Sequence, residues 1–265
     1  MTGKGVRVTL RLLFTNDDGV HADGLWALLE RAMLVEDIEV FVVAPDRERS
    51  ASGHAISIHS PIEVKRVPFK DPRFTIYGAG GTPADCVRLA IEGILDRPPD
   101  LVISGINRGP NLGTDVFYSG TVSAAMEGAL LGVKSVAVSV AAFENVQYEA
   151  AADITLSLAE MAVRDDQWPR LVNVNVPSLT KERIAGVSVT FLGIQTYKDA
   201  FKKRVDPKGR CWYWLGGLAK ESNDPEGSDT HAIKHNVISV TPLLTDLTDR
   251  SSLDILKSKS WLRSL

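Results

Sequence analysis

The chain has 265 residues, of which 44% are hydrophobic, and a net charge of −3, which suits one large domain or two small ones. This balance gives no basic footprint for a nucleic-acid polymer, and no apolar run approaches the ~20 residues that span a bilayer, so we expect neither as a partner. The two cysteines, Cys86 and Cys211, form no disulfide framework, and the N-terminus does not resemble a signal peptide, so we expect a cytoplasmic protein.

The N-terminal part of the chain alternates between apolar, β-branched runs and amphipathic segments. The pattern predicts strands at 6–14, 38–44, 100–103, 135–140 and 171–176, and helices at 24–35, 82–95, from 119 onward and at 149–162. Such alternation favours a Rossmann-like three-layer α/β sandwich with a mostly parallel sheet. Three prolines interrupt the segment 55–77, which we expect to form short strands outside the parallel sheet.

One predicted helix start carries several signals at once. Thr82 can cap the helix, Pro83 suits its first position, and Asp85 favours the positive end of the helix dipole.

The pattern changes near residue 180. Hairpin strands are predicted at 187–192, 201–205 and 211–215, followed by a strand at 236–241 and a C-terminal helix at 243–262. The predicted turn at 206–209 reads Asp-Pro-Lys-Gly, and the aromatic run Trp-Tyr-Trp lies at 212–214. We therefore divide the chain into an α/β body, 1–180, and a β-rich extension, 181–265.

Two adjacent carboxylates, Asp17 and Asp18, follow the first predicted strand. Each raises the pKa of the other unless a positive charge lies between them. Hard oxygen ligands of this kind suit Mg²⁺ or Mn²⁺, so we expect a metal here. Taken in isolation, Asp-Asp-Gly is also typical of a plain turn.

Polar loops at 15–23, 45–54 and 104–119 follow three of the predicted parallel strands. If these strands are neighbours, the loops meet at one edge of the sheet, and Ser50 and Asn107 join the two aspartates there. The helix start at 119–123 offers free N–H groups and a dipole end that favour phosphate. A metal beside a phosphate site suits phosphoester hydrolysis. Each loop also has an ordinary structural explanation, and only their convergence favours catalysis.

The motifs resemble those of the SurE family, the stationary-phase survival proteins. They are Thr-Asn-Asp-Asp-Gly at 15–19, Ala-Pro-Asp-Arg-Glu-Arg-Ser-Ala-Ser-Gly-His at 44–54, Gly-Thr-Pro-Ala-Asp-Cys-Val at 81–87, Ser-Gly-Ile-Asn-Arg-Gly-Pro-Asn at 104–111, Tyr-Ser-Gly-Thr-Val-Ser-Ala-Ala at 118–125 and Ser-Val-Thr-Pro-Leu at 239–243. The resemblance implies a metal-dependent 5′-nucleotidase that also accepts nucleoside 3′-monophosphates and, as in some members, short polyphosphate.

The resemblance also implies roles for particular residues. The ligands of one divalent metal per subunit, Mg²⁺ or Mn²⁺, fall on Asp17, Asp18, Ser50 and Asn107, and the two aspartates are also the catalytic pair. The phosphate pocket falls on Asn111, Ser119, Gly120, Thr121 and Ser123. Family members form homodimers or homotetramers in which the C-terminal hairpin and helix exchange between subunits. The segment around Asp229 departs from the family pattern, so neither Asp229 nor His235 receives a role.

Three other classes fit the sequence less well. A receiver-like signalling module also carries an acidic pair, but it is shorter and needs a phosphoacceptor aspartate after its third strand and a late lysine. A dinucleotide-binding oxidoreductase needs Gly-x-Gly-x-x-Gly in the first β–α turn, which this chain lacks. A haloacid-dehalogenase-type phosphatase uses Asp-x-Asp rather than adjacent aspartates. The proton donor to the leaving oxygen is not identified, and His54 is a candidate.

Overall fold

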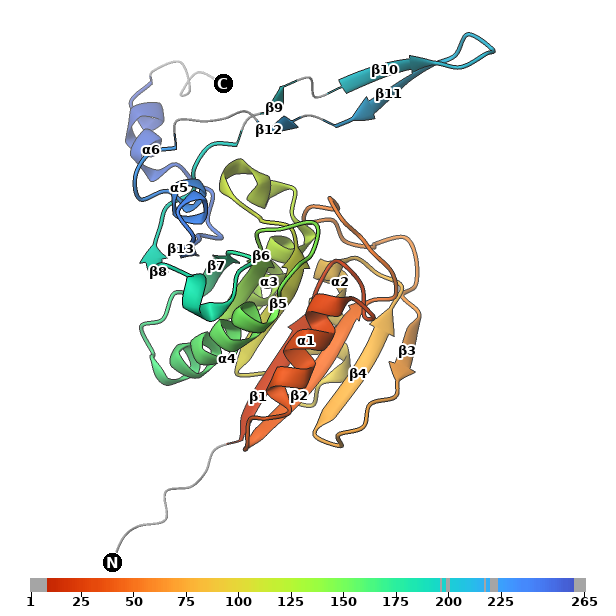
Figure 1. The fold of residues 1–265 in the computed structure, drawn as a ribbon, viewed down its shortest axis with the longest axis vertical. Helices are drawn as coiled ribbons and strands as arrows, with labels where there is room; N and C mark the ends of the chain where they lie inside the picture. The colour runs from red at the N-terminus through yellow and green to blue at the C-terminus, as the bar shows by residue number, and fades with distance from the viewer. Residues whose placement is uncertain (1–8, 196, 199–200, 217, 220–223, 260–265) are drawn as a thin grey trace, which may run out of the picture.

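The computed structural model describes residues 9–195, 197–198, 201–216, 218–219 and 224–259. One nine-stranded sheet, in the order β3-β4-β2-β1-β5-β6-β7-β13-β8, runs through the molecule (Figure 1). The elements up to residue 176 are β1 (Leu10–Thr15), α1 (Asp23–Ala32), β2 (Ile38–Pro45), β3 (Val64–Val67), β4 (Phe74–Ala79), α2 (Pro83–Leu89, continued by a π-helical turn, Ala90–Ile94), β5 (Leu101–Arg108), a 3₁₀ turn (Gly113–Phe117), α3 (Gly120–Leu130), β6 (Ser135–Val140), α4 (Glu149–Arg164) and β7 (Leu171–Val176).

Some of the later elements complete this sheet, and others lie outside it. They are a 3₁₀ turn (Lys181–Arg183), β8 (Gly186–Val189), β9 (Tyr197–Lys198), β10 (Phe201–Val205), β11 (Cys211–Leu215), β12 (Leu218–Ala219), α5 (Asp229–Lys234), β13 (Val237–Pro242) and α6 (Arg250–Lys257). Among the described residues, no helix is both long and apolar enough to cross a bilayer.

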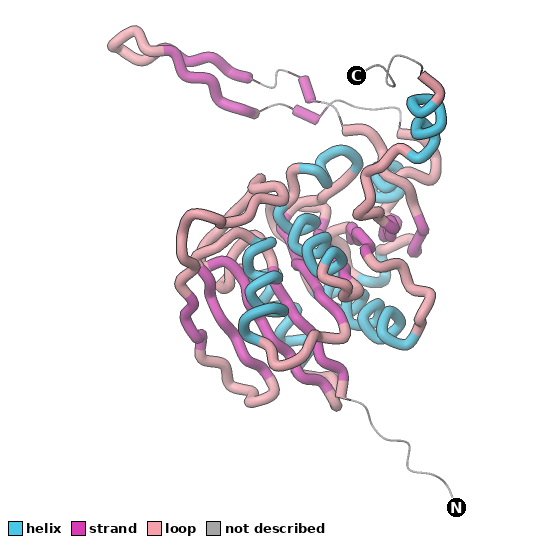
Figure 2. Tube along the Cα trace, turned by 180° about the vertical axis from the view of Figure 1, so that it is seen from behind, coloured by secondary structure: helices cyan, strands magenta, loops and turns pink. Residues whose placement is uncertain are grey.

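Six neighbouring strands, from β4 to β7, run parallel to one another. Helices α1 and α4 cover one face of the sheet, and α2 and α3 cover the other (Figures 1 and 2). Alternation along β1 serves both layers, because Leu12 and Phe14 join the core beneath α1 and α4, whereas Leu13 joins the core beneath α2 and α3. The predicted three-layer α/β sandwich is therefore confirmed.

The β6–α4–β7 crossover connection has the opposite handedness to the crossover connections through α1, α2 and α3. α1 leads from β1 toward the β3 edge and α4 leads from β6 toward the β8 edge, yet Arg31 of α1 pairs with Asp153 of α4 on the same face. α2 and α3 also lead toward the β8 edge, but on the opposite face, so they share the hand of α1. The α4 crossover is thus the rare left-handed one.

The predicted start of α2 is confirmed. The Thr82 hydroxyl accepts a hydrogen bond from the Asp85 N–H at 3.1 Å, and the Asp85 carboxylate accepts one from the Thr82 N–H at 2.9 Å. This reciprocal pair, with Pro83 in the first turn, satisfies two N–H groups that a helix start leaves free.

The prediction that 55–77 stays outside the parallel sheet is wrong for its last residues. β4 pairs in parallel with β2, with Ile76 opposite Val42, and β3 adds an antiparallel edge strand. All three prolines of the segment precede β4, so none of them removes a hydrogen bond from that strand.

Two predictions for the C-terminal part also need correction. The strand predicted at 187–192 is β8, which forms no hairpin but pairs in parallel with β13 at the edge of the main sheet. The last helix begins at Arg250 rather than at 243, because Asp249 caps it by accepting from the Ser251 and Ser252 N–H groups. Residues 260–262 of that predicted helix lie outside the described part of the chain.

The predicted hairpin of β10 and β11 is confirmed. Its strands pair antiparallel from Phe201 opposite Leu215 to Val205 opposite Cys211, and it projects away from the body (Figure 2). The division of the chain at residue 180 stays a prediction, although β13 and β8 beyond it complete the sheet.

A pair of leucines tests the packing of the α1 layer. Leu29 of α1 is fully buried, whereas Leu34, just past the helix, is 70% exposed. We expect Leu29→Ala to lower the free energy of unfolding by about 2–5 kcal/mol, since it leaves a cavity in the core. Leu34→Ala should change it by less than about 1 kcal/mol, because little buried surface is lost. Urea denaturation measures both, and equal effects would contradict this packing.

Candidate metal and phosphate site

The Asp17–Asp18 pair lies in a tight turn at the end of β1. The Asn16 side chain closes this turn by donating to the Gly19 carbonyl at 2.8 Å and accepting from the Gly19 N–H at 3.1 Å. Gly19 has φ +105°, and a Cβ there would lie 3.1 Å from the Arg47 backbone. Glycine therefore lets the turn press against the loop that follows β2.

Hydrogen bonds tie two further loops to the aspartates. The Arg49 N–H donates to the Asp17 carbonyl at 2.7 Å, and the Arg108 N–H donates to Asp18 Oδ2 at 3.0 Å. Ser50 directly follows Arg49, and Asn107 directly precedes Arg108. The structure therefore brings all four expected ligand residues to the carboxyl end of β1. This strand lies at the topological switch point, because the chain continues from β1 to β2 on one side and later returns to β5 on the other.

The Asp17 side chain lies against the first turn of α3. It is only 4% exposed, and its Oδ1 accepts a hydrogen bond of 2.5 Å from the Thr121 hydroxyl. A Cβ at Gly120 would lie 2.8 Å from Asp17 Oδ2, so only glycine allows this approach. The predicted metal residue and the predicted phosphate-binding helix start are thus in direct contact.

Both aspartates have raised pKa values. Burial raises the pKa of Asp17 to about 6; the hydrogen bond from Thr121 opposes this effect and the charge of Asp18 adds to it. Burial also raises the pKa of Asp18; the Arg108 N–H opposes this rise and the charge of Glu48 adds to it. Holding both groups ionised near neutral pH calls for a positive charge beside them.

The chemistry of the donor set suits a hard divalent cation. Within the described residues, no cluster of three or more histidine, cysteine, aspartate or glutamate side chains could hold a metal. The neutral oxygens of Ser50 and Asn107 would therefore have to complete the set around the two carboxylates. Carboxylate, hydroxyl and amide oxygens together fit Mg²⁺ or Mn²⁺.

Ser50 and Asn107 each make a local hydrogen bond. The Ser50 hydroxyl donates to Glu48 Oε1 at 2.7 Å, so it would have to turn away from Glu48 to reach a cation. The side-chain amide nitrogen of Asn107 donates to the Gly109 carbonyl at 2.8 Å, so the side-chain oxygen Oδ1 of Asn107 points away from Gly109.

Asn111 is held by a buried polar cage. Its N–H donates to Asn175 Oδ1 at 2.8 Å, its side-chain amide donates to the Ser139 hydroxyl at 2.8 Å, and its carbonyl accepts from both Asn173 and Asn175 at 2.9 Å. The cage fixes the loop between β5 and α3, but it also commits the Asn111 amide nitrogen to Ser139.

The remaining predicted phosphate residues lie in the first turn of α3. The Ser119 hydroxyl caps the helix by accepting from the Val122 N–H at 3.1 Å, and Ser123 is buried within the helix. The Ser119 and Thr121 hydroxyls already make hydrogen bonds, and the Thr121 N–H also donates to the Asp17 carboxylate, so the Gly120 N–H is the most direct donor to an anion.

Sequence reasoning missed several supporting residues. Asn173 and Asn175 lie on one face of the buried strand β7, and two asparagines at this spacing in an apolar run were the available signal. Asp229 is fully buried and accepts from the Gly113 and Gly193 N–H groups, each at 2.7 Å, so it holds the end of the Asn111 loop. No local pattern distinguishes it from an ordinary residue at a helix start.

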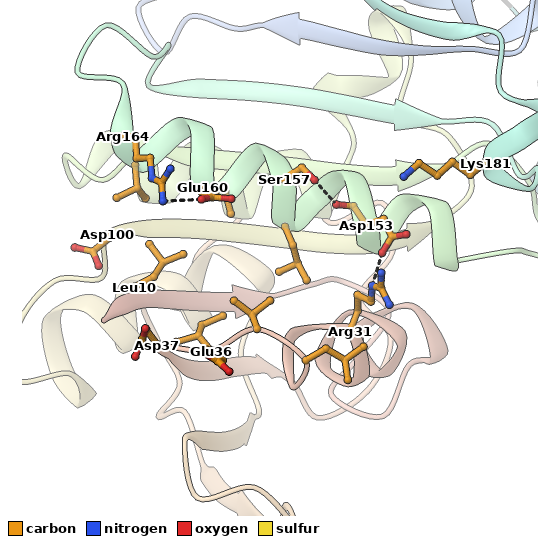
Figure 3. Close-up of a pocket in the computed structure, with 16 residues that line it drawn as sticks. Leu10, Arg31, Glu36, Asp37, Asp100, Asp153, Ser157, Glu160, Arg164 and Lys181 are labelled. Carbon is orange, nitrogen blue, oxygen red and sulfur yellow. Dashed lines mark hydrogen bonds and ion pairs between the residues drawn. The ribbon is translucent and has the colours of Figure 1, made fainter. Parts of the chain in front are cut away.

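A large groove lies elsewhere in the molecule. It measures roughly 930 Å³ and runs between α1 and α4 beside the first residues of β1 and β2 (Figure 3). Its walls include the ion-paired Arg31 and Asp153, and none of its lining residues belongs to the motif loops. Ligands of open α/β sheets bind at the carboxyl ends of strands, so this groove does not compete as the site.

The raised pKa of Asp17 predicts a pH-dependent cost of folding. A carboxyl whose pKa rises from 3.8 unfolded to about 6 folded stabilises the fold below pH 3.8, and this contribution is lost as the pH rises through 6. In EDTA, we expect Asp17→Asn to be more stable relative to wild type at pH 8 than at pH 4, by up to about 3 kcal/mol.

Urea unfolding at the two pH values measures this difference. Asp23→Asn, which alters an exposed carboxylate of the same segment, is the matched control and should show no such gain. A pH-independent effect of Asp17→Asn would contradict the assigned environment.

Comparison with known proteins identifies the family. The family model described as survival protein SurE matches residues 12–199. The chain is 49% identical to the 5′-nucleotidase SurE of Heliobacterium modesticaldum, covering 96% of this chain and 92% of that protein. It is 44% identical to the 5′-nucleotidase SurE of Carboxydothermus hydrogenoformans, covering 97% of both chains.

A solved structure agrees with the fold. The crystal structure of the SurE protein from Aquifex aeolicus superposes with a TM-score of 0.81 at 38% identity, covering 95% of this chain and 99% of that one. The matched segment contains the five motif stretches between residues 15 and 125, and the chain belongs to the SurE family.

Proposed function

We propose that this protein is a divalent-metal-dependent phosphohydrolase that releases phosphate from nucleoside 5′-monophosphates. The contact between Asp17 and the first turn of α3 carries the proposal, since it joins a cation-binding group to an anion-binding one. The names of the relatives, 5′-nucleotidase SurE, agree with this activity. Nucleoside 3′-monophosphates and short polyphosphate are further substrates to be tested in a panel with the 5′-monophosphates.

Four oxygen donors would hold one Mg²⁺ or Mn²⁺ per subunit: Asp17, Asp18, Ser50 and Asn107. When bound, the metal lowers the pKa of a water molecule and polarises a phosphoryl oxygen. Ionised Asp17 or Asp18 orients the attacking water. The hydrogen bonds that draw the three loops together at the end of β1 support these roles.

The phosphate group would lie at the start of α3. The Gly120 N–H, helped by the helix dipole, donates to a phosphoryl oxygen whose charge grows in the transition state. Ser119 and Ser123 shape this turn, and the caged Asn111 forms the facing wall. The cage matters because it fixes the loop that leads into α3, so that the helix start is already in place and needs no rearrangement as the charge develops.

We further propose that the protein is a homo-oligomer built through its C-terminal part. On β10 and β11, every residue is exposed, and one face of the hairpin is mostly apolar because cross-strand partners share a face. That face carries Phe201, Lys203, Val205, Cys211, Tyr213 and Leu215. Exposed apolar surface on this scale marks an interaction site, and a second copy of the chain, as a homodimer or homotetramer, is the proposed partner.

Removing either carboxylate tests the activity. We expect Asp17→Asn and Asp18→Asn each to lower phosphate release from adenosine 5′-monophosphate by ~100-fold or more, about 2.7 kcal/mol of transition-state stabilisation. EDTA should abolish turnover, and Mn²⁺ or Mg²⁺ should restore it. Asp23→Asn should retain wild-type turnover. Near-normal rates in both aspartate variants with metal present would refute the assignment.

Two substitutions on the apolar face test the oligomer. We expect the wild-type chain to have the mass of a dimer or tetramer by light scattering, and Phe201→Ser with Leu215→Ser to lower it, because a cross-strand apolar pair is lost. Leu34→Ser replaces a similarly exposed leucine that lies just past α1 rather than in the hairpin, and it should leave the mass unchanged. A monomeric wild-type protein would rule out this assembly.

A further inference from the structure

Glu127 is a buried carboxylate with no part in the proposed reaction. It lies late in α3, is 3% exposed, and shares the helix with small apolar neighbours such as Ala124 and Ala125. Burying an ionised carboxylate is costly unless hydrogen-bonded partners compensate. Two side chains from other parts of the chain do so.

Each oxygen of Glu127 has its own partner. Arg88 of α2 donates from Nε to Oε1 at 2.7 Å, and His54 Nε2 lies 2.7 Å from Oε2. His54 is the last residue of the motif loop that follows β2 and carries Ser50. The carboxylate therefore joins α2, α3 and this loop at one point.

The Ser50 loop is attached to the body at both ends. Its near end is held by the Asp46 N–H on the Ala79 carbonyl at 2.8 Å and by the Arg49 N–H on Asp17. Its far end is held by the Gly53 N–H on the Tyr118 carbonyl at 3.1 Å and by His54 on Glu127. Ser50 lies between these attachments.

The far end of the 46–54 loop contains a backbone conformation that is unfavourable by itself. Ala51 has φ +54°, a left-handed conformation that is unfavourable for a residue with a Cβ. A loop of this kind keeps its shape only where surrounding contacts hold it. Next to Gly53, the hydrogen bond between His54 and Glu127 contributes to this hold, and the Thr82 hydroxyl donates to the Ala55 carbonyl just beyond it at 2.7 Å.

We propose that His54 and Glu127 are positioning residues that hold the far end of the 46–54 loop on α3, so that Ser50 stays in register with Asp17 and Asp18. The inference rests on the proposed metal site and extends it to residues outside the ligand set. It also gives His54 a role in loop placement, because the hydrogen bond commits Nε2 to Glu127.

The test is a double-mutant cycle on metal affinity. Isothermal titration of EDTA-stripped, full-length protein with Mn²⁺ compares wild type, His54→Ala, Ser50→Ala and the double variant. We expect His54→Ala to weaken Mn²⁺ binding by about tenfold, within the range for groups that orient metal ligands. The double variant should bind no more weakly than Ser50→Ala, because His54 acts through Ser50.

Two further variants separate positioning from general stability. His54→Gln, which can still donate to Glu127, should recover most of the affinity. Arg88 also pairs with Glu92, whose Oε2 lies 2.9 Å from Arg88 Nη1. Glu92→Gln removes this second carboxylate and should leave Mn²⁺ affinity unchanged. Hydrogen exchange at the amides of residues 50–54 should become faster in His54→Ala without any metal present.

Each outcome decides a different point. Wild-type affinity in His54→Ala, or additive effects in the double variant, would overturn the positioning role while leaving the metal site intact. A wild-type protein that binds no Mn²⁺ would overturn the metal site, and the positioning role with it.

Discussion

Two neighbouring carboxylates at the end of β1, one of them almost fully buried, impose the constraint on which the site depends. Burial raises both pKa values, so the pair needs donors and a cation to stay ionised. The surrounding chain supplies donors to the carboxylates: the Thr121 hydroxyl from α3 donates to Asp17, and the Arg108 N–H donates to Asp18. The Arg49 N–H ties a further loop to the main-chain carbonyl of Asp17. The loops that satisfy the aspartates are the same ones that carry the proposed metal and phosphate ligands, so stability and function share one set of contacts.

The site reaches well beyond the loops that line it. Asn173 and Asn175 of β7 hold the Asn111 loop from the middle of the sheet, and Asp229 of α5 holds its end through Gly113. The C-terminal part thus supports the proposed phosphate pocket as well as presenting the exposed hairpin. The Asp229 carboxylate and the hydrogen bond from the Thr114 hydroxyl to the Gln195 carbonyl connect the C-terminal part to the loop that leads into α3.

Several features of the site are locally unfavourable. Ala51 adopts a positive φ, Asp17 is ionisable yet buried, and Glu127 places a carboxylate in a helix of small apolar residues. A core spread over both faces of a nine-stranded sheet can tolerate such costs. Costs of this kind are tolerated at functional sites, where surrounding contacts hold an otherwise unfavourable geometry.

Local patterns in the sequence determined the α/β class, the cap of α2, and the hairpin of β10 and β11. They also contain the family motifs that make candidate metal ligands of Asp17, Asp18, Ser50 and Asn107. These features depend on residues close together in the chain, which is why periodicity and spacing reveal them. Only the tertiary structure decided that β4 joins the parallel sheet and that β13 and β8 form its far edge. It also decided that His54 forms a hydrogen bond with Glu127, 73 residues away in the sequence. Strand order and buried polar pairing depend on which distant surfaces meet, and no local pattern encodes that choice.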